Sequence, residues 1–145
     1  MMGAGADDYA GDVSPSYAFD VLKAEADAVL IDVRTRPEWG FVGVPDLSDL
    51  GKSVGFIEWV SYPEMAPNDL FPAELTRFCG DDKTRAVFFL CRSGQRSRAA
   101  AIAATAAGFD RAYNVEGGFE GSLDASRHRG GVNGWKAAGL PWAQT

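Results

Sequence analysis

The chain is poor in the side chains that most often do covalent or metal chemistry. It has one histidine, His128, and two cysteines, Cys79 and Cys91, among 145 residues. A zinc site would need all three side chains and a further ligand, at no familiar spacing. A Cys–His catalytic pair has only His128 available, and nothing local ties it to Cys91. We therefore expect no metal and no cofactor. Two cysteines make no disulfide framework, so we also expect a reducing, cytoplasmic setting.

Positive charge and long apolar runs are also scarce. Lysine and arginine total 14 against 20 acidic residues, and the formal net charge of -6 argues against a nucleic-acid partner. No apolar run approaches the roughly 20 residues that span a bilayer, so we expect no membrane role. Residues 1–12 are small and acidic and lack the basic start and apolar middle of a signal peptide. We expect one domain over 1–145, with 1–12 as a flexible N-terminus.

Short apolar runs alternate with segments of helical spacing along the rest of the chain. Strands are expected at 28–33, 86–91 and 111–115, and helices at 14–27, 72–80 and 96–108, with a short helix within 133–142 that Gly139 and Pro141 stop. Alternation of strand and helix predicts an α/β fold, with a mostly parallel central sheet and helices on both faces. Sites in such sheets form at the carboxyl ends of the strands.

The segment 41–72 does not follow this alternation. It is rich in proline and aromatic residues, and only 53–60 reads as a strand. The remainder is expected to be irregular loop that packs on the body through residues such as Trp59 and Tyr62. A connection of this length without regular structure is more often functional than an ordinary linker.

Cys91 stands where a buried strand ends and a helix begins. In CRSGQR, Gly94 lets the backbone curl so that successive N–H groups form an anion cradle. The helix dipole and the nearby Arg92, Arg96 and Arg98 favour a thiolate, which is a nucleophile without a histidine partner. Most cysteines are buried and inert, and this setting is what separates Cys91 from them. Cys79 lies at the end of an amphipathic helix without such a cradle, and we interpret it as structural.

Four stretches in this order resemble the single-domain rhodanese family of sulfurtransferases. They are LIDVRTRPEW, LCRSGQRSRAAA, GFDRAYNVEGGFEG and GWKAAGLPW. The resemblance implies a rhodanese-like three-layer fold and a persulfide on catalytic Cys91. It also implies that the loop residues bind the substrate and the persulfide: Arg92, Ser93, Gly94, Gln95 and Arg96. Arg92 is expected to meet an anionic donor and Arg96 to brace the loop, although the two roles are exchangeable.

The loop length separates sulfur transfer from related chemistries. Rhodanese-type enzymes resemble this chain in their Cys-x4-Arg loop, from Cys91 to Arg96, whereas cysteine phosphatases and arsenate reductases use Cys-x5-Arg, a position that holds Ser97 here. The resemblance favours transfer of a sulfane sulfur from a donor such as thiosulfate to a thiol or cyanide. A phosphatase or arsenate reductase is the weaker enzyme hypothesis. The donor remains open among thiosulfate, glutathione persulfide, a desulfurase persulfide and 3-mercaptopyruvate.

Other residues near the expected site have two interpretations. Asp32 and Arg34 end a strand at the same sheet edge as Cys91, and we favour a structural ion pair or loop brace over substrate contact. Glu38 is a candidate partner for Arg34. His128 is expected at the surface. Many family members carry GHIPGA after the first motif, and this chain carries GFVGVPDL, which departs from the family pattern.

This departure keeps a second hypothesis open. The segment 41–72 either lines the pocket and selects the acceptor or forms a docking surface. In the second case the chain is a sulfur-relay or protein-binding module that acts with a partner protein.

Overall fold

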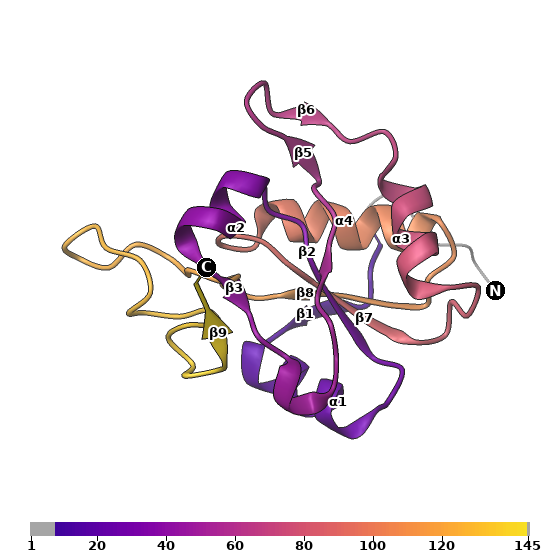
Figure 1. The fold of residues 1–145 in the computed structure, drawn as a ribbon, viewed down its shortest axis with the longest axis horizontal. Coiled ribbons are helices and arrows are strands. Elements are labelled where there is room, and N and C mark those ends of the chain that lie inside the picture. The colour runs from indigo at the N-terminus through magenta and orange to yellow at the C-terminus, as the bar shows by residue number, and fades with distance from the viewer. Residues whose placement is uncertain (1–7, 145) are drawn as a thin grey trace.

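A parallel sheet of five strands organises the chain, in the order β1-β8-β7-β2-β4 (Figure 1). The structure is a computed structural model, and it describes residues 8–144. The strands are β1 (Gly11–Val13), β2 (Val29–Asp32), β4 (Gly55–Phe56), β7 (Ala86–Leu90) and β8 (Arg111–Val115). All four pairings in this sheet are parallel. The expected α/β class and its parallel sheet are therefore confirmed.

Helices cover both faces of the sheet, which makes three layers. Helix α1 (Pro15–Ala24) lies on one face, and α3 (Phe71–Cys79) and α4 (Gln95–Ala106) lie on the other (Figure 1). All five residues of β7 are buried and divide between the two sides, because side chains alternate along a strand. Phe88 packs with Leu22 of α1, whereas Phe89 packs with Leu75 of α3 and Ala104 of α4.

Most expected elements lie within one or two residues of their predicted bounds. Ser14 caps α1 as expected, since its hydroxyl accepts the Tyr17 N–H at 3.1 Å. The expected flexible N-terminus spans 1–12, and residues 1–7 of it lie outside the described part of the chain. Gly11 and Asp12 belong to β1 and pair with β8.

The helix expected at 133–142 is wrong. Residues 133–140 form bends and turns, and β9 (Trp142–Ala143) then pairs antiparallel with β3 (Val44–Pro45). Gly134 and Gly139 both have positive φ angles, 97° and 74°, which end a right-handed helix. Trp135 instead anchors this stretch, because its fully buried indole donates to the Pro141 carbonyl at 2.7 Å.

The segment 41–72 is more regular than expected. It contains the end of α2 (Arg36–Val42), β3, a 3-10 turn η1 (Ser48–Leu50), the edge strand β4, and a hairpin of β5 (Val60–Ser61) and β6 (Ala66–Pro67). The hairpin projects beyond the sheet above α2 and α4 (Figure 1). Across residues 8–144, no helix is long and apolar enough to cross a membrane.

Candidate active site

Cys91 directly follows β7, a central strand of the sheet, and its residue is only 1% exposed. The loop after it turns sharply at Gly94, whose φ of 117° favours glycine. This turn aims the Gly94 N–H at the Cys91 Sγ, with a donor-to-sulfur distance of 3.1 Å. The first helical bond of α4 runs from Arg98 N–H to the Gly94 carbonyl. The N–H groups of the first turn therefore remain available near the sulfur.

A glycine-containing turn after β8 forms hydrogen bonds with the backbone of this loop. The Phe119 N–H donates to the Cys91 carbonyl at 2.7 Å, and the Glu120 N–H donates to the Arg92 carbonyl at 2.9 Å. Gly118 has a φ of 62°, and a Cβ there would lie 2.4 Å from the Cys91 carbonyl oxygen. The close approach of the two turns therefore requires glycine at position 118.

A buried hydrogen-bonded chain leads from the sulfur to β1. The Ser97 hydroxyl lies 3.1 Å from Cys91 Sγ and 2.6 Å from Asn114 Oδ1. Asn114 Nδ2 in turn donates to Asp12 Oδ1 at 3.0 Å, and the Tyr9 hydroxyl donates to the same oxygen at 2.7 Å. This bond to Asp12, followed by desolvation, raises the pKa of Tyr9. Ser97 and Asn114 are both buried.

The direction of this chain follows from what each group is able to donate. An ionised carboxylate only accepts, so Asp12 faces the Asn114 amide nitrogen, and the amide oxygen must face Ser97. The Ser97 hydroxyl has a single hydrogen, which it directs either to Asn114 or to the sulfur. Ser97 thus lies within hydrogen-bond distance of both the sulfur and Asn114 Oδ1, and its one hydrogen serves one of them at a time.

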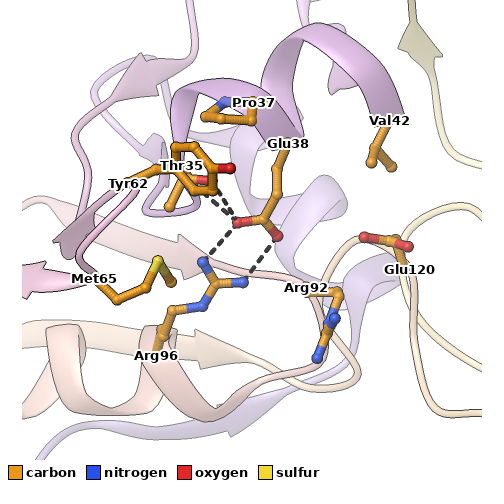
Figure 2. A pocket seen from close by; sticks show the side chains of 9 residues that line it. All are labelled: Thr35, Pro37, Glu38, Val42, Tyr62, Met65, Arg92, Arg96 and Glu120. Atoms are coloured by element: carbon orange, nitrogen blue, oxygen red, sulfur yellow. Dashed lines mark hydrogen bonds and ion pairs between the residues drawn. The ribbon is translucent and has the colours of Figure 1, made fainter.

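Arg96 closes the loop by a bidentate ion pair with Glu38 of α2. The two bonds measure 2.7 and 2.9 Å (Figure 2). Burial alone would raise the pKa of Glu38, but the hydrogen bonds and charge of Arg96, together with bonds from Thr35, lower it to about 2. The Glu38 hydrogen bond raises the pKa of Arg96. The Arg96 charge is therefore neutralised within the protein.

Two pockets adjoin the loop. The smaller, about 310 Å³, is lined by the proposed substrate loop itself: Cys91, Arg92, Ser93, Gln95 and Arg96. The larger, about 520 Å³, shares Arg92 and Arg96 with it and extends to α2, the β5–β6 hairpin and Glu120 (Figure 2). Cys91 thus lies on the floor of a small opening beside a roomier cavity.

The structure places Asp32 and Arg34 behind the site. Their side chains are fully buried and paired at 2.7 Å, and Arg34 also donates to the Gly43 carbonyl at 2.8 Å. The Arg34 guanidinium lies 4.3 Å from the centre of the Phe119 ring. Neither residue lines the two pockets at the loop. The expected Arg34–Glu38 pair is wrong, because Glu38 reaches Arg96 instead.

His128 and Cys79 both lie away from the loop pockets. His128 is exposed, and its backbone N–H donates to Asp124 at 2.8 Å. Burial raises the pKa of the Cys79 thiol to about 11. Among residues 8–144, no group of three or more His, Cys, Asp or Glu side chains is placed to hold a metal ion.

Sequence reasoning missed the second half of the site. Asp12, Asn114 and Glu120 were not singled out, and Ser97 was considered only for the loop count. The available signal was Asn114, a polar residue inside the otherwise apolar run AYNV. A buried amide in a strand needs hydrogen-bond partners, and its strand ends at the same sheet edge as β7.

We expect Glu38→Gln to destabilise the protein by about 2 kcal/mol at pH 7, after allowing for partial exposure of the pair. The folded-state pKa of about 2 lies below the usual 4.5, so ionised Glu38 stabilises the fold above about pH 4.5. That contribution is lost as the pH falls towards 2. Urea unfolding at several pH values measures it, with the exposed Glu64→Gln as control. A penalty that does not shrink in acid would contradict this account.

Ser97→Ala should slow alkylation of Cys91 by a small reagent such as iodoacetamide roughly tenfold, because a hydrogen-bond donor to the sulfur is lost. Thr105→Ala removes a hydroxyl from the same helix, where it bonds the Ala101 carbonyl, and serves as the matched control. Alkylation rates of Cys91 and free energies of unfolding are compared for both variants. Equal slowing in the two variants would assign the effect to the helix rather than to the hydroxyl.

Comparisons with known proteins agree with this geometry. A family model described as STR4 middle domain matches residues 10–145. An uncharacterized protein of Rickettsia conorii is 39% identical over 126 residues, 86% of this chain and 90% of the relative. The crystal structure of Rv0390 from M. tuberculosis is 53% identical, with a TM-score of 0.86, over 95% of this chain and 100% of that one.

Two further solved structures share the fold. A polysulfide-sulfur transferase homodimer from Wolinella succinogenes is 25% identical, with a TM-score of 0.61, over 97% of this chain and 82% of that one. A rhodanese-like domain protein from Staphylococcus aureus shares the fold at 22% identity, with a TM-score of 0.51, over 74% of this chain and 86% of that one. The chain belongs to the STR4 middle-domain family and has the rhodanese-like fold.

Proposed function

We propose that this protein is a sulfurtransferase that carries a sulfane sulfur as a persulfide on Cys91. The observation that carries the proposal is the Cys91-to-Arg96 loop, with the sulfur at the end of a central strand and the Gly94 N–H 3.1 Å from it. Support also comes from the similarity to the polysulfide-sulfur transferase of Wolinella succinogenes. The location we propose is the cytoplasm, because both cysteines are unpaired.

In the first step, the Cys91 thiolate attacks the outer sulfur of a donor. With thiosulfate, a new S–S bond forms to Cys91, the S–S bond of thiosulfate breaks, and sulfite leaves with the electron pair. Among residues 8–144 the Arg92 side chain has no ion pair or hydrogen bond, whereas Arg96 is paired, so Arg92 is the group proposed to meet an anionic donor. Arg96 holds the far end of the loop through Glu38.

In the second step, an acceptor thiolate or cyanide attacks the outer sulfur of the persulfide. The bond between the two sulfurs breaks, and the electron pair returns to Cys91 as thiolate. The Gly94 N–H and the other N–H groups at the start of α4 stabilise the anionic persulfide. The Ser97 hydroxyl adds a donor that reorients from Asn114. No cofactor or metal enters either step.

The decisive experiment is intact mass of the protein before and after thiosulfate. We expect the mass to rise by one sulfur atom and cyanide to remove it as thiocyanate. Cys91→Ser should lose both, because no nucleophile remains. Cys79→Ala is the matched control and should load normally, since burial keeps that thiol protonated. No gain in mass with thiosulfate or with an organic persulfide would overturn the proposal.

The β5–β6 hairpin favours a second candidate, a relay module that exchanges sulfur with a partner protein. Tyr62 is 61% exposed and Met65 is 46% exposed, yet both also line the larger pocket. Exposed aromatic and methionine side chains at a site entrance are typical of protein contacts. In this case a sulfur-loaded protein donor should load Cys91 far faster than small donors do. If Tyr62→Ala loads no faster from the protein donor than from small donors, and still loads from thiosulfate, the relay role is supported. If the protein donor remains faster in Tyr62→Ala, contact of the partner with Tyr62 is excluded.

A further inference from the structure

The charges around the larger pocket do not favour a simple anion. Its lining holds two cations, Arg92 and Arg96, and two carboxylates, Glu38 and Glu120. Glu38 and Arg96 pair with each other at 2.7 Å and leave little net charge. One charge of each sign then remains for a ligand: the Arg92 guanidinium and the Glu120 carboxylate. Within residues 8–144 neither has a side-chain hydrogen bond or ion pair.

Glu120 is held at a fixed place beside the loop. The Glu120 N–H donates to the Arg92 carbonyl at 2.9 Å, and the Glu120 carbonyl accepts the Gly130 N–H at 2.6 Å. Figure 2 shows its carboxylate and the Arg92 guanidinium on the same side of the pocket, opposite Tyr62 and Met65. The backbone contacts thus hold the two residues next to each other, and their side chains of opposite charge extend from there into the pocket lining.

Lys136 is the other cation that acts on Glu120. The Glu120 charge opposes the dominant effect of desolvation, which lowers the pKa of Lys136. The Lys136 ammonium, however, donates to the Val42 carbonyl at 3.2 Å and lies 4.0 Å from the centre of the Trp142 ring. It does not form an ion pair with Glu120, so the carboxylate remains available to a ligand.

The rest of the lining is apolar or weakly polar, and the space is large. Pro37, Val42, Tyr62 and Met65 contribute hydrophobic surface, and the volume is about 520 Å³. Pockets for organic ligands have this size and mixture, with apolar walls and a few polar groups that fix orientation. A thiosulfate dianion would use little of the apolar surface, and Glu120 would repel it.

We propose that this pocket binds an organic thiol of the amino-acid type as the sulfur acceptor, with its carboxylate on Arg92 and its ammonium group on Glu120. The inference rests on the proposed sulfurtransferase function. The bound thiolate attacks the outer sulfur of the Cys91 persulfide, the S–S bond to Cys91 breaks, and the acceptor leaves as its own persulfide. The electron pair stays on Cys91 as thiolate, so the step needs no oxidant or reductant.

Three small thiols test the two contacts separately. L-cysteine carries both charges, cysteamine lacks the carboxylate, and 3-mercaptopropionate lacks the ammonium group. Cys91 is first loaded with thiosulfate, excess donor is removed, and discharge by each thiol is followed by intact mass over a range of concentrations. Using the same thiol in variant and wild type cancels differences in thiol acidity.

Glu120→Gln should reduce the second-order rate of discharge by L-cysteine and cysteamine about tenfold, the size expected for one charged hydrogen bond. In the same variant, the rate of discharge by 3-mercaptopropionate should stay the same or rise, because the Glu120 carboxylate no longer repels this anionic thiol. Arg92→Gln should show the complementary pattern, with losses for L-cysteine and 3-mercaptopropionate only. Glu116→Gln, on the same turn but outside the pocket lining, controls for net charge.

The outcomes separate the two proposals. If wild-type protein takes up no sulfur, the sulfurtransferase function itself fails. If it loads but Glu120→Gln changes all three thiols by the same factor, or no more than Glu116→Gln does, the amino-acid-type acceptor is wrong and the loading chemistry stands. If Arg92→Gln slows discharge by L-cysteine and 3-mercaptopropionate while Glu120→Gln slows none of the thiols, the acceptor is an acid without an ammonium group. That result also overturns the inference.

Discussion

The contact between two backbone turns is the constraint on which the rest of the site depends. The Cys91 carbonyl accepts the Phe119 N–H at 2.7 Å, and Gly118 allows this approach because it has no side chain. This contact joins the end of β7 to the end of β8 and places Glu120 beside Arg92. The loop that carries the sulfur is therefore shaped by the sheet edge as well as by its own residues.

Electrostatic balance is the second property of the site. The buried Asp32–Arg34 pair and the half-buried Glu38–Arg96 pair each neutralise an arginine within the protein. A buried arginine without its carboxylate would be costly, so these pairs hold β2 and α2 in place around the loop. Of the two arginines that line the pockets, Arg96 is paired with Glu38, and the Arg92 side chain has no ion pair with the described residues and is free to bind a ligand.

The elements that the sequence predicted well are those with strong local signals. Runs such as AVFFL and a capped start such as Ser14-Pro15 specify a strand and a helix by themselves, and Cys91 follows directly from the run before it. Asp12 and Asn114 are 102 residues apart, and only the pairing of β1 with β8 brings them together. The expected helix at 133–142 is absent because Gly134 and Gly139 adopt positive φ angles and Trp135 is buried in the core, where it donates to the Pro141 carbonyl. The burial of Trp135 depends on residues far away along the chain, which no local pattern shows.

The depth of Cys91 has a consequence for oxidation. An empty Cys91 is 1% exposed, so bulky reagents do not reach its sulfur. The persulfide proposed on Cys91 adds one sulfur atom and places the reactive end about one bond length, roughly 2 Å, beyond the cysteine sulfur. In this proposal the resting protein holds a buried thiol, and the loaded protein carries its reactive sulfur one atom further along the side chain. Oxidants then meet the attached outer sulfur before the cysteine sulfur, so the persulfide replaces the thiol as the first target of oxidation.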